Sequence, residues 1–552
     1  MIGPILRRRR RDVVVGSVAV MFHQASEALV PIVIGLAIDR AIVTGDGAAM
    51  TRWAGVLVGV FAVLTVAGLL GYFALDRAGI WIAHDVRQAI VERVLDPRGG
   101  VVARPGDVVS LGSNDADQVG AVSFAIGLGI GALPPLVGGS IYLLTISIPL
   151  GLVVIVGVPV VVAAIAAVSR PLVGRSEQEQ EAVAAATGVA TDLLHGLRVL
   201  KGLGVSREAT SRYQSASRRA LSARLRAARF WAGYEGATLA VSGALLVVVA
   251  WVGGRIAVAG DITVGQFVIA VGLAQFLIGP LWMLVGAGES AMTVRASARR
   301  VRALLAHPLA IADEALTNPL ASDGALTVRF VGVTHGTLDD VNFDIDAGRM
   351  VGIVARPADA AVIVELLARR SDPGRGHVEV GGVDVRSWPL AELRAAVMVS
   401  DADAVVFDNT IEREVRLATD DPSGAQAAAH AATVDEIVGT LPTGAMRLGE
   451  GGRRLSGGQR QRVVLARALA TRAPVLVIHD ATTAVDASTE HLIASRTAEL
   501  RHGRGTTVVV TTSPTMLATC DDVIVIDGGR VAQRGTHAAL ANDPDYRDLV
   551  LG

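Results

Sequence analysis

The chain has a single cysteine, Cys520, among its 552 residues. One thiol cannot form an internal disulfide bond, and it cannot supply a metal site built from several cysteine ligands. The formal net charge is also close to zero, at −1, so no bulk electrostatic attraction to nucleic acid is expected. These absences exclude a disulfide framework and a multi-cysteine metal site, and they give no reason to expect a nucleic-acid partner.

The N-terminus does not have the pattern of a cleavable signal peptide. Five arginines, Arg7 to Arg11, precede an apolar segment that is too long for a signal h-region. Apolar residues make up 51% of the chain and are concentrated in the first 290 positions. Their long runs meet the roughly 20-residue length needed to cross a bilayer. At this length we expect two or three domains.

Six membrane-spanning segments are predicted in the first half of the chain. The loops between them alternate between short, nearly uncharged ones and two long, arginine-rich ones at 78–118 and 169–230. Basic loops stay in the cytoplasm, so a multi-pass protein of the cell (plasma or inner) membrane with both termini cytoplasmic is expected. Residues 176–228 favour helix almost throughout, so the membrane helices are expected to continue into the cytoplasm. The predicted spans are 13–40, 53–77, 119–143, 148–168, 231–256 and 264–288.

Several polar residues fall inside the predicted spans. An ionisable group in a membrane is a functional candidate, because an unpaired charge there is costly. One interpretation is that these groups pair across helices or reach water at the end of a span. The other is that Glu27 and Glu235 line a substrate cavity. The candidate substrate-binding residues are His23, Glu27, Glu235 and Gln275.

The pattern of the chain changes near residue 306. We expect a transmembrane domain over 1–305 and, from the prolines and the lack of periodicity, a linker over 306–324. From residue 325 to 552, short β-type runs alternate with turns, as in an α/β nucleotide-binding domain. Two hairpins are predicted, one turning at Gly381-Gly382 and one at Gly528-Gly529.

The most specific motif is Leu455-Ser456-Gly457-Gly458-Gln459-Arg460-Gln461-Arg462. About twenty residues later comes the strand-like run Val475–His479, followed by Asp480 and, further on, Asp486. This pair resembles the signature and Walker B regions of an ATP-binding cassette (ABC) transporter. With these two regions, six predicted spans and two long intracellular loops, the chain resembles a type IV (exporter-fold) ABC half-transporter. The resemblance implies an α-helical membrane domain followed by an α/β P-loop-NTPase-like domain.

The phosphate-binding loop expected from this resemblance lacks its chemistry. A P-loop needs glycines that turn backbone N–H groups toward phosphate, a lysine, and a Ser/Thr hydroxyl for magnesium. Here alanines stand at the glycine positions, Ala361 replaces the lysine and Val362 replaces the hydroxyl, while Asp359 adds negative charge. A helix is expected over about 361–369. The degenerate loop comprises Ala355, Arg356, Pro357, Ala358, Asp359, Ala360, Ala361 and Val362.

Other positions of the same site also depart from the family pattern. The Walker B strand normally ends in two carboxylates, but here His479 is followed by Asp480, or Asp480 by Ala481 if the alignment shifts by one residue. Thr512 stands where the resemblance implies a switch histidine. The glutamine of the Q-loop falls on Ala402 or Asp401, and the aromatic that stacks on adenine is replaced by His335. We therefore predict that the chain's own site is non-catalytic.

The residues that act on a partner's nucleotide are retained. Ser456, Gly457, Gly458 and Gln459 begin a predicted helix whose N–H groups and dipole favour an anion, and Asp486 marks the D-loop. In the family these groups meet ATP held by the other subunit. The resemblance therefore implies a heterodimer in which a second half-transporter with intact Walker A and B motifs holds most of the ATP and Mg²⁺, and this chain alone is inactive.

The transported substrate and the direction of transport stay open at this stage. Export of an amphipathic small molecule, lipid or peptide is the favoured function. A siderophore-type importer with the same fold and a regulatory or scaffold subunit without an ATPase role are the alternatives.

Overall fold

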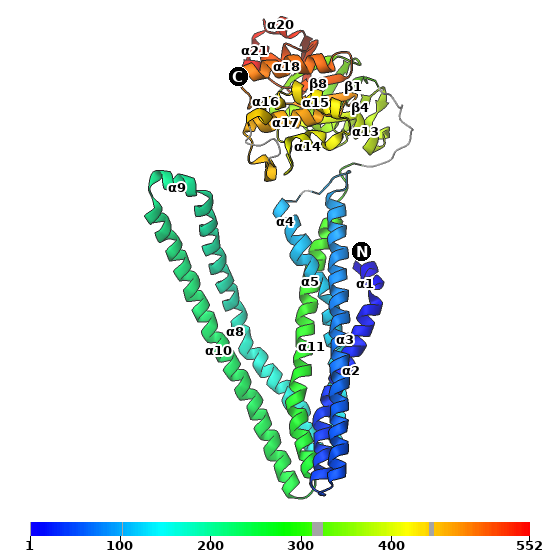
Figure 1. Cartoon of the computed structure of the whole chain (residues 1–552), viewed down its shortest axis with the longest axis vertical. Helices are drawn as coiled ribbons and strands as arrows, with labels where there is room; N and C mark the ends of the chain where they lie inside the picture. Colours follow the sequence, from blue (N-terminus) through cyan, green and yellow to red (C-terminus); the bar gives the residue numbers. More distant parts are fainter. Residues whose placement is uncertain (1, 102, 312–323, 441–446, 552) are drawn as a thin grey trace. The chain divides into compact units, whose positions relative to one another are not determined.

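The computed structural model describes residues 2–101, 103–311, 324–440 and 447–551 (Figure 1). The chain forms two compact units, Met1–Glu92 with Ala103–Ala306, and Arg93–Val102 with His307–Gly552. Most of the predicted linker 306–324 lies outside the described residues. The boundaries proposed from the sequence for the three segments therefore stay predictions.

The first unit is entirely helical among the residues described. Six of its helical stretches are long and apolar enough to span a membrane, as predicted. They extend beyond the spans read from the sequence, because α3 continues to Val94 and α10 already begins at Ser206. The helices are α1 (Ile2–Arg8), α2 (Arg10–Ala37), a π-helix (Ile38–Ile42), α3 (Gly47–Val94), α4 (Pro105–Ser110), a second π-helix (Leu111–Asp115), α5 (Ala116–Gly120), α6 (Val122–Gly131), α7 (Leu133–Ile146), α8 (Ile148–His195), α9 (Leu197–Leu203), α10 (Ser206–Val258) and α11 (Val264–Leu305).

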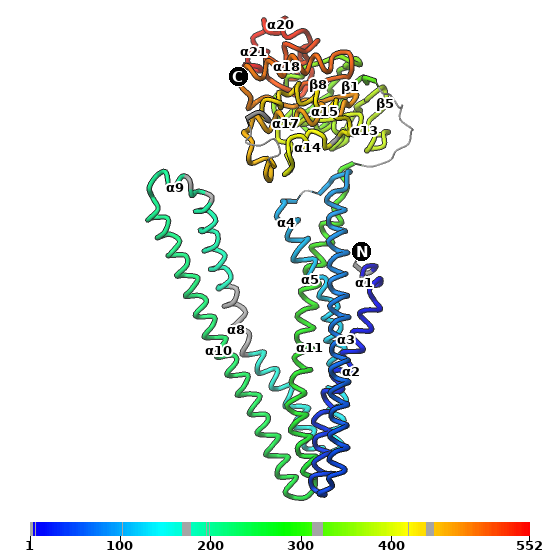
Figure 2. The backbone as a smooth tube through the Cα atoms, viewed as in Figure 1, coloured from blue at the N-terminus to red at the C-terminus, as the bar shows by residue number. Residues whose placement is uncertain are grey.

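The long arginine-rich loop is helical, as predicted for residues 176–228. The helices α8 and α10 run side by side and are joined by the short helix α9 (Figures 1 and 2). An α-helix satisfies its own backbone hydrogen bonds, which a lipid environment requires. The membrane helices can therefore continue into water without a change of backbone structure, and only their side chains become polar.

Polar side chains fix the ends of two membrane helices. Thr263 caps α11, and its side chain and that of Gln266 form a reciprocal capping box. Asp39, in the π-helix that ends the α2 stretch, accepts hydrogen bonds from the Thr263 hydroxyl and from the backbone N–H of Gly265. The C-terminal end of the first span is thus tied to the beginning of the last one.

The second unit contains two sheets, as expected for the ABC-type α/β domain. The smaller sheet has the order β2-β1-β4-β5 and the larger has the order β10-β9-β3-β8-β7-β6. Both predicted hairpins are present: β4 pairs with β5, and β9 pairs with β10. The strands are β1 (Val328–His335), β2 (Leu338–Ile345), β3 (Met350–Ala355), β4 (Arg375–Val380), β5 (Val383–Asp384), β6 (Val397–Asp401), β7 (Val475–His479), β8 (Thr506–Val510), β9 (Asp522–Asp527) and β10 (Arg530–Gly535).

Helices pack on this sheet framework and bury it. The strand β3 is buried along its whole length, as is β8, which explains their continuous apolar sequences. The helices are α12 (Pro357–Leu367), α13 (Leu390–Ala396), α14 (Ile411–Val415), α15 (Pro422–Ala431), α16 (Val434–Thr440), α17 (Gly457–Ala470), α18 (Ala487–Arg501), α19 (Pro514–Leu517), α20 (His537–Leu540) and α21 (Pro544–Leu551), with 3₁₀ turns at Val385–Ser387, Arg416–Ala418 and Glu450–Gly452.

A buried arginine joins α18 to the large sheet. Arg501 is 5% exposed, and its guanidinium donates hydrogen bonds to the carbonyls of Ala473 and Thr506 and to the Thr507 hydroxyl, at 2.9–3.1 Å. Burial lowers the pKa of Arg501 to about 10, so the group is still charged at neutral pH.

We expect Arg501→Met to destabilise the second unit by roughly 3 kcal/mol, because it leaves buried acceptors without a donor. For a domain of this size the unfolding midpoint of the full-length chain should fall by roughly 6–12 °C. Arg504→Met is the matched control at an exposed position, and it should change stability by less than about 0.5 kcal/mol. Equal midpoints for the two variants would contradict the structural role of Arg501.

Candidate functional site

The carboxyl ends of four neighbouring parallel strands meet at one edge of the large sheet. The strands β3, β8, β7 and β6 are consecutive neighbours, with His479 in register with Val510 and with Asp401. Ligands of open parallel sheets bind at this edge. The edge brings together the predicted segment 355–362, which follows β3, with Asp401, His479 and Thr512 at the ends of the other three strands.

Residues 357–362 of this segment are helical where the sequence led us to expect a loop. The helix α12 begins at Pro357, with Arg356 as its N-cap, rather than at about residue 361. Proline favours the first helical position and alanine has the highest helix propensity, while no glycine is present to hold an open loop. The N–H of Ala360 donates to the carbonyl of Arg356 at 2.9 Å. That N–H is therefore used within the helix.

The charges in this segment are not arranged to hold a phosphate. Asp359 lies in the first turn of α12 and is only 5% exposed, so a carboxylate already lies near the helix end that would attract an anion. Arg356 instead forms an ion pair with Asp527, with Nη2 3.1 Å from Oδ1. Asp359 has the opposite charge to the missing lysine. Arg356 has the same charge as lysine, but it is paired with Asp527.

The same segment does not fit a magnesium ion. Val362, which replaces the hydroxyl residue, is partly buried and packs beside Gly336 in the turn between β1 and β2. Within the described parts of the chain, no cluster of three or more His, Cys, Asp or Glu residues could hold a metal. In this segment only the buried Asp359 offers a side-chain oxygen of the kind that Mg²⁺ prefers, and no hydroxyl stands at the position of Val362.

A chain of polar contacts occupies the Walker B end of the site. His479 Nδ1 lies 3.2 Å from Asp401 Oδ1, and His479 Nε2 lies 3.9 Å from Asp480 Oδ2. Arg370, which follows α12, lies 3.5 Å from the other Asp401 oxygen. Asp401 and His479 were predicted from the sequence as separate positions, and their contact was not predicted. Their equivalent positions at the ends of two buried strands were the available signal, but strand order was needed to use it.

The predicted adenine-side residue is also bound internally. His335 ends β1, and its Nε2 lies 3.1 Å from the Ser371 hydroxyl, while Thr512 is exposed just beyond β8. Asp401, His479 and Thr512 thus follow neighbouring strands of the large sheet, whereas His335 belongs to the smaller sheet. Among these residues, a direct contact is present between Asp401 and His479.

The signature segment, in contrast, forms a complete helix N-terminus. Ser456 is the N-cap of α17; its hydroxyl accepts from the Gln459 N–H at 3.2 Å, and the Gln459 side chain accepts from the Ser456 N–H at 2.9 Å. Ser456 and Gly457 are exposed. A capped and exposed helix end can present its remaining N–H groups to an anion.

The signature helix is tied to the D-loop through Gln461. Its side chain is 8% exposed, donates to the Thr483 hydroxyl at 2.7 Å and accepts from the Ala484 N–H at 2.9 Å. A Cβ at Gly458 would lie 2.4 Å from the Ala484 carbonyl oxygen, so only glycine fits there. Gln461 was not among the site residues predicted from the sequence.

Asp486 has a local role as a helix cap. It is the N-cap of α18 and accepts hydrogen bonds from the Ser488 hydroxyl and the Thr489 N–H. These bonds hold the pKa of Asp486 well below its usual range. No hydrogen bond or ion pair among the described residues links Ser456–Gly458 or Asp486 to the segment 355–362, so the two sets of predicted residues remain separate within this chain.

The candidate residues in the spans do not form one cluster. His23 Nδ1 lies 2.8 Å from the Leu64 carbonyl oxygen, and its Nε2 lies 4.0 Å from Glu27. Glu235 on α10 and Gln275 on α11 are exposed, and neither has a hydrogen bond or ion pair within the described part of the chain. A contact with the neighbouring helix is thus present for His23, whose ring also lies near Glu27, while the substrate role of Glu27, Glu235 and Gln275 stays a prediction.

Six apolar helices followed by a nucleotide-binding α/β domain with a formed signature helix define a cassette-type membrane transporter. Models of the ABC transporter transmembrane region and of the ABC transporter match residues 13–281 and 338–483. The chain belongs to the ABC transporter family and has the exporter-type half-transporter arrangement of one transmembrane region and one nucleotide-binding domain.

Named relatives and a solved structure agree with this assignment. The chain is 32% identical over 98% of its length to a multidrug efflux ATP-binding/permease protein of Mycobacterium tuberculosis, of which it spans only 46%. It is 26% identical to an ATP-dependent lipid A-core flippase of Thiobacillus denitrificans, over 96% of this chain and 94% of the relative. The fold is similar to that of a bacterial Atm1-family ABC exporter solved with ATP bound, with a TM-score of 0.76 and 24% identity over 99% of this chain and 98% of that one.

We expect Gln461→Leu to loosen the D-loop, because it removes one hydrogen-bond donor and leaves the Ala484 N–H without an acceptor. The cost should be about 1–3 kcal/mol, and amide exchange over residues 482–486 should become faster. Gln426→Leu, at an exposed position of α15, is the control. Unchanged exchange at 482–486 in the Gln461 variant would show that this contact does not hold the D-loop.

Proposed function

We propose that this chain is the non-catalytic-site subunit of a heterodimeric ATP-driven transporter. One contrast supports the proposal. The helix end at Ser456 is capped and exposed, whereas residues 357–362 form the first turns of a helix that carries a buried carboxylate. An exposed, capped helix N-terminus stabilises an anion, whereas a carboxylate buried in the first turn of a helix disfavours one.

The proposed heterodimer is based on which nucleotide-site residues this chain retains. Two copies of this chain would combine two signature helices with two segments that lack lysine and a magnesium ligand. A partner half-transporter with intact Walker A and B motifs would hold ATP and Mg²⁺, and Ser456–Gln459 of this chain would contact the γ-phosphate. When bound, the magnesium would neutralise phosphate charge. This chain would donate N–H groups to the phosphate and exclude water at the closed interface.

Export is the favoured direction, and an amphipathic small molecule, lipid or peptide is the favoured substrate. Support comes from the relatives named for multidrug efflux and for lipid A-core transport, and these names do not favour the siderophore importer. In this proposal the protein lies in the cell membrane. Both termini and the α8–α10 extension are on the cytoplasmic side, because the loops there are rich in arginine.

A regulatory or scaffold subunit is the second candidate. Its cassette would serve only for dimerisation, which the loss of phosphate and magnesium groups would permit. The capping box at Ser456 and the Gln461 link to the D-loop are then without an evident purpose. ATP hydrolysis by the assembled protein distinguishes the two functions.

We expect no magnesium-dependent ATPase activity from this chain alone, and activity after copurification with a half-transporter partner. Ser456→Asp should abolish the coupled activity, because it retains a good N-cap but places a carboxylate near the phosphate. Ser456→Asn, which also caps the helix without adding charge, is the matched control for folding and should lose less activity. Mutation of the partner's P-loop lysine should have the same effect as Ser456→Asp.

Two outcomes would contradict this proposal, and a third would limit the loss in the chain's own site to catalysis. Robust hydrolysis by the chain alone would show that residues 355–362 hold phosphate in another way. Coupled activity that is unchanged in Ser456→Asp would favour the scaffold function. Tight binding of a fluorescent ATP analogue to the chain alone, at micromolar concentration, would show that its own site retains nucleotide.

Glu235 is the sharper of the two acidic substrate candidates, because it is exposed on α10 whereas Glu27 lies near His23. For a cationic amphipathic substrate, Glu235→Gln should raise the concentration that half-maximally stimulates the coupled ATPase, by several-fold. Gln275→Glu is a useful counterpart, since it adds a charge at another exposed polar site. An identical response of wild type and Glu235→Gln to cationic and neutral compounds would remove Glu235 from the binding site.

A further inference from the structure

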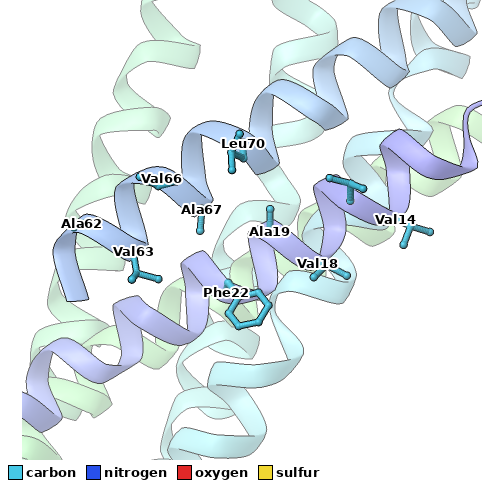
Figure 3. Close-up of a pocket in the computed structure, with 10 residues that line it drawn as sticks. Val14, Val18, Ala19, Phe22, Ala62, Val63, Val66, Ala67 and Leu70 are labelled. Atoms are coloured by element: carbon cyan, nitrogen blue, oxygen red, sulfur yellow. The ribbon is translucent and has the colours of Figure 1, made fainter. Parts of the chain in front are cut away.

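An open apolar groove runs between α2 and α3 on the surface of the membrane unit (Figure 3). Its volume is about 650 Å³, within the range of roughly 300–1,000 Å³ that is typical of small-molecule sites. Every residue that lines it is apolar. They are Val14, Val15, Val18, Ala19, Phe22, Ala62, Val63, Val66, Ala67 and Leu70.

Close packing at small residues sets how the two antiparallel helices align. A Cβ on Gly16 would lie 2.8 Å from the Leu75 side chain, and one on Gly71 would lie 2.9 Å from Val20. Residue numbers therefore rise along α2 as they fall along α3. By this alignment, residue 77 of α3 lies at about the level of residue 14 of α2.

Both apolar stripes end on an arginine at the same end of the groove. Arg11 is four residues before Val15 and seven before Val18, and Arg77 is seven residues after Leu70 and eleven after Val66. These spacings place each arginine on the same helix face as the apolar residues of its stripe. The groove is thus apolar along its length and positively charged at one end.

The two arginines are exposed and available. Neither Arg11 nor Arg77 has a hydrogen bond or ion pair with the residues that the structure describes. Nearby Arg9, in contrast, lies 3.7 Å from Asp85 and 4.7 Å from the centre of the Trp81 ring. Arginine and tryptophan together are typical of the headgroup level of a bilayer, so this end of the groove has the composition of a membrane interface.

We propose that the groove binds an anionic phospholipid, with an acyl chain along α2 and α3 and the phosphate between Arg11 and Arg77. Basic sites beside membrane helices on the cytoplasmic side recognise anionic headgroups in this way. The apolar lining favours a lipid over free phosphate, and the two unpaired charges favour an anionic lipid over a zwitterionic one. The proposal rests on the six membrane-spanning helices and on the proposed cytoplasmic orientation of the N-terminus, and it does not depend on the proposed heterodimer.

The test uses the full-length chain in lipid nanodiscs that contain phosphatidylglycerol with a photoreactive acyl chain. Peptide mapping should locate the cross-link at residues 14–22 or 62–70. In Arg11→Gln/Arg77→Gln the yield should fall at least tenfold, and Arg11→Lys/Arg77→Lys should retain most of it because it keeps both charges. Phosphatidylcholine with the same acyl chain should cross-link weakly to this groove.

The matched control is Arg52→Gln/Arg255→Gln, which removes two charges elsewhere. Arg52 lies near the start of α3, far along the helix from Arg77, and Arg255 lies near the C-terminal end of α10. Two results would overturn the proposal. Equal labelling by both lipids, unaffected by the glutamine substitutions, would mean ordinary solvation by bulk lipid. Absence of lipid labelling together with disulfide cross-linking between two chains through Val18→Cys or Val66→Cys would mean that a protein surface covers the groove.

Discussion

The parallel alignment of β3, β8, β7 and β6 determines where chemistry can occur in the second unit. Each strand enters this sheet in the same direction, so the residues that follow each of the four strands lie along one edge. Residues separated by 78 positions become neighbours for this reason alone. The contact between His479 and Asp401 is a direct result, and so is the position of α12 beside them.

At that edge, the loss of glycine changes backbone structure as well as chemistry. Glycine-rich loops remain open because no side chain restricts them and because helix formation is unfavourable for glycine. The alanines and proline of 355–362 remove both obstacles, and α12 begins at Pro357. The first turn of α12 then uses backbone N–H groups in helix hydrogen bonds and also carries the carboxylate of Asp359. Arg356 and Arg370 pair with Asp527 and Asp401, so the positive charges near the site are already engaged.

The membrane half follows a different constraint. Hydrocarbon requires helices, and apolar composition along the chain is enough to locate them. For this reason the six spans were predicted correctly from hydrophobic runs, as was the helical continuation of residues 176–228. The alignment of α2 against α3 could not be predicted, because it depends on contacts at Gly16 and Gly71 between distant segments. Without it, Arg11 and Arg77 have no relation to each other.

By itself, the sequence determined the class of the protein, the two-part architecture, the signature helix and the absence of lysine and hydroxyl groups in 355–362. Local spacing and composition decide each of these features. Only the tertiary structure decided that α12 begins early, that Asp401 contacts His479, that Gln461 holds the D-loop, and that an apolar groove ends on two arginines. Each of these depends on which distant segments become neighbours, and strand order and helix packing are properties of the whole fold.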